Sequence, residues 1–146
     1  MPTHKESINL SYSREELCKL ILDVEKYPEF LPWCSKCKII NKKSEEHFFA
    51  ELEVHYKHFK KSYISEIKVI KNDELIEIKV KMVKGPFKRL INIWKLTEKN
   101  NLTELEFFID IELKSFALQL MLKALFNNVY KKMLESFQAR AKEIYG

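Results

Sequence analysis

Residues 75–82 read Leu-Ile-Glu-Ile-Lys-Val-Lys-Met, so that apolar and charged side chains alternate strictly. A period of two is typical of a β-strand with one face in a core and the other in solvent. The same alternation recurs through the middle of the chain, and polar clusters separate the segments. The strands it predicts lie near 35–43, 47–56, 62–71, 75–84, 88–98 and 103–114. Because the connections are short and one face of each strand is polar, we expect an antiparallel meander.

Helical signals flank this region. A short strand is expected at 4–10, and Ser13 then precedes Glu16 by three positions, the pattern of a helix N-cap. Residues 27–33 hold two prolines and three aromatic side chains, which allows at most one helical turn packed against an apolar surface. From Phe116 to Tyr145 apolar residues recur every three or four positions, predicting a helix about 45 Å long. The expected fold is therefore α+β, with a curved sheet of about seven strands around a long C-terminal helix and two short N-terminal helices.

Composition excludes several classes of protein. With 146 residues, 46% of them apolar, the chain is expected to form a single domain over 1–146. Its only glycines are Gly85 and Gly146, which excludes the glycine-rich loops of nucleotide-binding folds. The most apolar run, 116–126, is shorter than the roughly 20 residues of a bilayer-spanning helix. Residues 1–10 carry charges where a secretion signal would be apolar, so we expect a cytoplasmic protein.

Chemical motifs are weak. Cys34 and Cys37 have the spacing of zinc and redox sites, but no second ligand pair at matching spacing follows, although His55 and His58 could complete a site. We expect no metal and ordinary half-buried thiols. The histidines are expected near strand ends or on outward positions, and no serine or cysteine lies in a nucleophile motif, so no catalytic residue is predicted.

Four short strings occur in a specific order. They are Tyr27–Cys34, Gly85-Pro86-Phe87 before Leu90, Asn92 and Trp94, Phe107–Asp110 before Lys114-Ser115, and Phe137 with Arg140-Ala141 before Tyr145-Gly146. With these strings the chain, from about Ser7 to Gly146, resembles the coenzyme Q-binding START-domain family. That family also contains the ribosome-association toxins named RatA, and it belongs to the polyketide cyclase/dehydrase superfamily.

This resemblance implies a START-like helix-grip fold and a protein that is not an enzyme. It implies binding of coenzyme Q (ubiquinone) or a similar polyprenyl lipid, with ubiquinone as bound ligand, no catalytic cofactor, and a role as chaperone or carrier in respiratory electron transport. The alternative that it implies is a toxin that binds the large ribosomal subunit and blocks subunit joining. No residue separates these two subgroups.

Inward positions of the strands and of the last helix would line a cavity between them. The candidate ligand-binding residues are Trp33, Ile78, Val80, Met82, Asn92, Trp94, Phe107, Ile109, Leu122, Phe126, Val129 and Met133. Any of the apolar members could equally be ordinary core. Asn92 stands in an otherwise apolar inward series, where it could hydrogen-bond a quinone carbonyl or satisfy the backbone.

Three predicted connections meet at one end of the sheet and gather lysines there. We call this end the lysine pole, defined by Lys57, Lys60, Lys61, Lys84, Lys88 and Lys114. Lysines attract anionic lipid headgroups and aromatic side chains insert beside them, so a peripheral contact with the inner membrane is expected. The candidate membrane-docking residues are Lys57, Phe59, Lys60, Lys61, Lys84, Pro86, Phe87, Lys88, Phe116 and Leu120.

The lysine pole has other possible occupants. A protein partner or a second copy of the chain, giving a homodimer, could cover its apolar side chains. The basic character, with 26 Lys and Arg against 21 Asp and Glu, also fits ribosomal RNA. Arginine occurs only at Arg14, Arg89 and Arg140, which weakens a nucleic-acid interpretation because arginine is the usual bidentate phosphate ligand. No DNA partner is expected.

Overall fold

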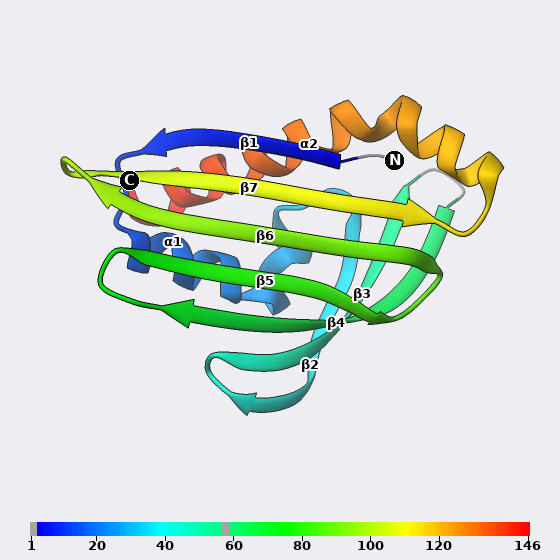
Figure 1. Cartoon of the computed structure of the whole chain (residues 1–146), viewed down its shortest axis with the longest axis horizontal. Helices are drawn as coiled ribbons and strands as arrows, with labels where there is room; N and C mark the ends of the chain where they lie inside the picture. The colour runs from blue at the N-terminus through cyan, green and yellow to red at the C-terminus, as the bar shows by residue number, and fades with distance from the viewer. Residues whose placement is uncertain (1–2, 57–58) are drawn as a thin grey trace.

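The computed structural model describes residues 3–56 and 59–146, without the side chains of residues 3, 4, 56, 59, 118 and 121–129. In this part of the chain seven strands form one antiparallel sheet in the order β1-β7-β6-β5-β4-β3-β2 (Figure 1). The strands are β1 (Thr3–Leu10), β2 (Cys34–Ser44), β3 (His47–Tyr56), β4 (Phe59–Lys71), β5 (Leu75–Lys84), β6 (Phe87–Lys99) and β7 (Leu102–Leu113). The helices are α1 (Arg14–Leu22), the 3-10 helix η1 (Val24–Glu29) and α2 (Phe116–Tyr145).

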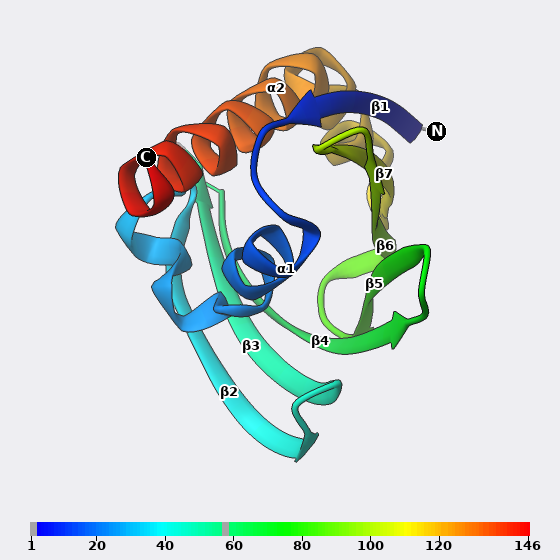
Figure 2. The same cartoon turned by 90° about the vertical axis from the view of Figure 1, so that its left-hand side faces the viewer.

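The predicted meander and the long final helix are confirmed. Strands β2 to β7 pair with their sequence neighbours, and β1 returns to pair with β7. Strand β4 begins at Phe59, three residues before its predicted start, because its pairing with β3 continues to the connection between them. Figure 2 shows the sheet curving around a concave side, with α2 passing between its two edges.

The main core lies on the concave side at the end that α1 occupies. There the Trp94 ring centroid is 4.7 Å from that of Phe107 and 5.0 Å from that of Phe137 on α2. The turn predicted within 27–33 also packs on α2, since the rings of Tyr27 and Phe30 lie 5.5 and 5.1 Å from Phe137. A smaller cluster of buried side chains lies toward the lysine pole.

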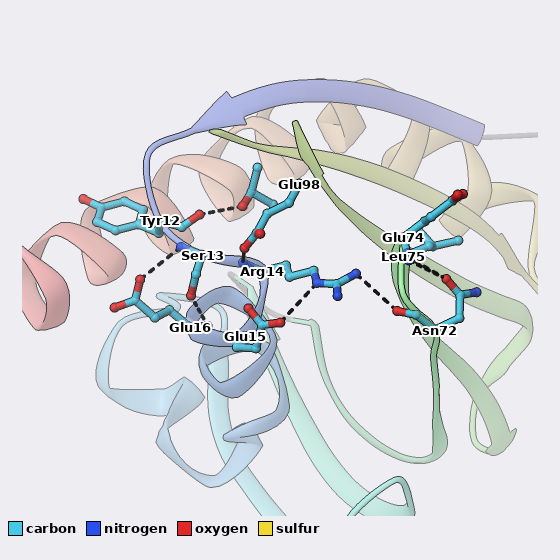
Figure 3. Close-up of polar contacts among 10 residues, drawn as sticks. Tyr12, Ser13, Arg14, Glu15, Glu16, Asn72, Glu74, Leu75 and Glu98 are labelled. Carbon is cyan, nitrogen blue, oxygen red and sulfur yellow. Dashed lines mark hydrogen bonds and ion pairs between the residues drawn. The ribbon is translucent and has the colours of Figure 1, made fainter. Parts of the chain in front are cut away.

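Helix α1 lies at the end of the sheet opposite the lysine pole (Figure 1), and Figure 3 shows polar contacts that fix it there. Its predicted N-cap is confirmed: the Glu16 amide donates to Ser13 Oγ at 3.1 Å, and the Ser13 amide donates to the Glu16 carboxylate at 3.0 Å. The backbone amide of Arg14 donates to Glu98 Oε1 on β6, and the guanidinium of Arg14 donates to the Asn72 carbonyl in the β4–β5 turn. Helix α1 therefore closes that end of the concave side (Figure 2).

Candidate functional site

Apolar side chains on the concave face of the sheet are fully buried near α1, and toward the lysine pole buried and half-buried side chains alternate. Near α1, Ile78, Trp94 and Phe107 are at most 1% exposed. Toward the lysine pole, the next inward residues on two of these strands, Val80 and Ile109, are only half-buried. Sheet pairing places Val80 and Ile109 in the row next to that of Ile78, Trp94 and Phe107, and Asn92 between them is buried. An apolar ligand on this row would cover the half-buried side chains.

The structure divides the candidate ligand-binding residues. Ile78, Trp94 and Phe107 lie in the packed core, where the two aromatic rings contact each other. The half-buried candidates on the concave side are Trp33, Val80, Met82, Ile109 and Met133. The side chains of Leu122, Phe126 and Val129 lie outside the described residues.

Asn92 satisfies the protein backbone. It is buried, and its Nδ2 donates a hydrogen bond of 2.9 Å to the Phe108 carbonyl on the neighbouring strand β7. This hydrogen bond satisfies the Phe108 carbonyl, and the N–H that makes it is not available to a quinone carbonyl.

Sequence reasoning missed several half-buried residues at the same end. Leu52 and Val54 on β3, Tyr63 on β4 and Ile111 on β7 share the concave face with Met82. The alternation within each strand assigns them to this face. Which of them are covered depends on where the helices lie, and the sequence of a single strand does not predict that.

The two thiols of β2 were predicted to be half-buried. Cys37 is half-buried, whereas Cys34 is buried, and both are free. Burial raises the pKa of Cys34 to about 11 and that of Cys37 to about 12, so both thiols are protonated at neutral pH. The described residues contain no group of three or more His, Cys, Asp or Glu side chains that could hold a metal ion.

The described part of the lysine pole is assembled as predicted. Antiparallel pairing puts the end of β3, the start of β4, the β5–β6 connection and the start of α2 at one end of the molecule (Figure 1). Its described lysines are all exposed, namely Lys60, Lys61, Lys84, Lys88 and Lys114. Lys57 and the side chain of Phe59 lie outside the described residues.

The apolar side chains of the pole are distributed differently from the prediction. Phe116 and Leu120, one turn apart on α2, are 79% and 54% exposed, as docking side chains would be. Phe87 is 5% exposed and its ring lies 5.4 Å from that of Tyr63, so its assignment as a membrane-docking residue is wrong. Pro86 is half-buried.

Gly85 explains why the chain turns inward at Phe87. A Cβ atom on Gly85 would lie 2.5 Å from Cβ of Tyr63 and 2.9 Å from the sulfur of Met82, so only glycine allows this close approach. The register shift between Phe87 and Arg89 then turns the Phe87 ring toward Leu90 and Leu113.

An ion-pair network close to this end lies on the convex face. Arg89 Nε donates to Asp110 at 2.8 Å, and its Nη1 lies 3.0 Å from Glu112. This ion-pair network is separated from the concave face by the sheet. Among the described residues, no helix combines the length and the hydropathy of a membrane span.

These features define the class of the protein: a curved antiparallel sheet that grips a C-terminal helix, the START-like fold. A START superfamily protein from Mycobacterium smegmatis superposes with a TM-score of 0.81 at 16% identity, covering 97% of this chain and 98% of that one. The family described as polyketide cyclase / dehydrase and lipid transport matches residues 10–138, and the chain belongs to this family.

Two curated relatives carry different functional names. Ribosome association toxin RatA of Rickettsia prowazekii (strain Madrid E) is 32% identical over 136 residues, covering 92% of this chain and 92% of the relative. Coenzyme Q-binding protein COQ10, mitochondrial, of Dictyostelium discoideum is 32% identical over 148 residues, covering 99% and 71%. The resemblance drawn from the sequence is therefore confirmed at the level of the family.

Proposed function

We propose that this chain is a non-catalytic protein that holds a polyprenyl quinone of the coenzyme Q class, or a similar polyprenyl lipid, against the concave face of its sheet. The observation that carries the proposal is the row of half-buried apolar side chains toward the lysine pole, Val80, Met82, Ile109 and Ile111. The relative that is named for coenzyme Q binding supports the choice of ligand. The ion pairs of Arg89 lie on the opposite face, so they would not act on a ligand held there.

The ligand's tail gives a reason to work at a membrane. Each isoprene unit has five carbons, and exposing it to water costs several kcal/mol at about 0.8 kcal/mol per CH₂. A carrier should therefore take up and release such a lipid while touching the bilayer. The exposed Phe116 and Leu120 would enter the interface, and each neighbouring lysine would add about 1 kcal/mol of attraction to anionic lipid. We place the protein in the cytoplasm at the inner membrane surface, where it would support respiration as a lipid chaperone.

The bound lipid itself is the test. The protein should be purified from its own host without detergent, extracted with organic solvent and examined by mass spectrometry. The proposal expects a polyprenyl quinone at close to one molecule per chain. Protein without prenyl lipid under these conditions would contradict it.

The full-length match to a ribosome association toxin supports a second candidate. The exposed lysines of the pole would then contact ribosomal phosphates rather than lipid. Sedimentation of the purified protein with separated ribosomal subunits distinguishes the two functions. Binding to large subunits that blocks their joining would support the second candidate.

A further inference from the structure

Three polar side chains are buried among the described residues: Ser65, Asn92 and Thr103. Two of them have hydrogen-bond partners. Asn92 donates to the Phe108 carbonyl, and Thr103 Oγ1 donates to the Tyr12 carbonyl at 2.6 Å. Ser65 is 0% exposed, and its Oγ has no partner in the part of the chain that the structure describes. A buried hydroxyl without a partner costs about 1–3 kcal/mol, so such a group calls for an explanation.

Ser65 lies on the concave face of β4, in a row of paired residues that runs across the sheet. Its paired neighbours are Ala50 on β3 and Met82 on β5. Ala50 and Ser65 have small side chains, whereas the flanking rows carry the larger Ile67 and Tyr63 on β4. The side chains of this row therefore project less far from the sheet than those of its neighbours. Met82 is half-buried, and methionine is the most adaptable of the large apolar side chains. A flat ring held over this part of the sheet would lie against the Ser65 hydroxyl, beside Met82.

The backbone is irregular at the same point. Pairing shifts register between Ile64 and Ser65, so that Ile64 faces Lys84 whereas Ser65 faces Met82, and Val83 is the extra residue of a bulge. Bulges occur preferentially beside functional sites, where they re-aim a side chain. The unpartnered hydroxyl, the small neighbour and the bulge thus coincide in one row.

We propose that the Ser65 hydroxyl anchors the polar head of the ligand by donating a hydrogen bond to a ring carbonyl oxygen. This inference rests on the proposed function and specifies the position of the head within that site. The head would lie over Ala50 and Ser65, and the prenyl tail would extend along the half-buried residues toward the lysine pole. The hydrogen bond that Ser65 lacks in the described structure would then be supplied by the ligand.

Two probes with the same tail test this assignment by calorimetric titration: decylubiquinone, which has ring carbonyls, and decylbenzene, which has none. The change is Ser65→Ala. The matched control is Thr103→Val, which removes a buried hydroxyl that already has a protein partner. Thermal unfolding of each ligand-free variant is measured in parallel.

We expect Ser65→Ala to weaken binding of decylubiquinone about tenfold, the effect of one hydrogen bond, and to leave decylbenzene binding unchanged. Its Tm should equal or exceed that of the wild type, because an unpartnered polar group has been removed. Thr103→Val should lower Tm and leave the affinity ratio of the two probes unchanged. Equal affinity of Ser65→Ala and wild type for decylubiquinone, or equal losses for both probes, would overturn the assignment. If the wild type binds neither probe, the proposed function itself fails and the anchor falls with it.

Discussion

Cys34 and Cys37 show how the fold determines the chemistry of single residues. Their spacing suggests metal or redox chemistry, but both side chains belong to the concave side of β2 and pack with the core. Both thiols are free in the structure. Burial also raises both pKa values, which disfavours the reactive thiolate. These are structural thiols.

Their raised pKa values predict a stability that decreases in alkali. An unfolded thiol ionises near pH 8.5, whereas the folded pKa values are about 11 and about 12. The contribution of each thiol to the free energy of unfolding is therefore fully present below about pH 8.5. It is lost as pH rises toward 11–12, by at most about 1.4 kcal/mol per pH unit for each thiol. Urea unfolding at pH 8, 9 and 10 should show this decline in the wild type and a smaller one in the Cys34→Ala, Cys37→Ala variant.

Ser35→Ala is the control, because it changes a neighbouring residue on β2 that has no titration in this range. It should decline as the wild type does. Identical slopes in the wild type and the double cysteine variant would show that the thiols do not ionise later in the folded state than in the unfolded one.

At the level of elements, α1 closes one end of the concave side and its N-cap helps to hold it there. Ser13→Ala removes the hydroxyl that accepts from the Glu16 amide and also breaks the capping box. We expect a loss of about 1 kcal/mol in the free energy of unfolding. Denaturant unfolding measures it, and Ser11→Ala, an exposed serine two residues earlier, is the control that should change stability little.

Equal stability of the Ser13→Ala and Ser11→Ala variants would show that the cap contributes nothing. Because α1 lies far from the lysine pole, Ser13→Ala should leave binding to vesicles unchanged, which separates the stability of this end from the docking function of the other.

The sequence predicted the elements well, and the reason is local. Alternation in β5 and β7, the Ser13–Glu16 cap and the spacing within α2 are each contained in a few consecutive residues. The concave site was predicted only in part. Alternation identifies the inward face of β6, but it does not show that Trp94 meets Phe137 on α2 or that Asn92 donates to β7. The first contact depends on where α2 lies, and the second depends on how β6 pairs with β7.

The prediction that Phe87 is an exposed docking residue was wrong for a related reason. It follows Gly85-Pro86, so the sequence suggests an exposed loop residue. In the structure it begins β6, and a register shift turns it inward against Tyr63. A bulge or shift of this kind depends on strand pairing and has no signature in a single segment.

For the whole molecule, the polarity between a closed end and the lysine pole predicts where a membrane would attach. Phe116→Asp should weaken binding to vesicles containing anionic lipid about tenfold, because a large apolar side chain leaves the interface and a negative charge enters it. The control is Ile70→Asp, since Ile70 is 62% exposed but lies at the opposite end of β4. Vesicle co-sedimentation measures both.

The Ile70→Asp variant should bind as the wild type does, and high salt should weaken binding of every variant. A Phe87→Asp variant, by contrast, should be destabilised because its side chain is buried. Equal losses in Phe116→Asp and Ile70→Asp would exclude a docking surface restricted to the lysine pole.

Methyl NMR of the labelled protein during titration with decylubiquinone shows whether a prenyl quinone lies on the half-buried part of the concave face. We expect large shifts for the methyl groups of Val80, Met82, Ile109 and Ile111, and little change for Ile78 and Leu96 in the closed core. Saturating ligand that leaves these four signals in place, or that shifts only convex-face residues such as Ile91 and Ile93, would contradict this placement of the quinone.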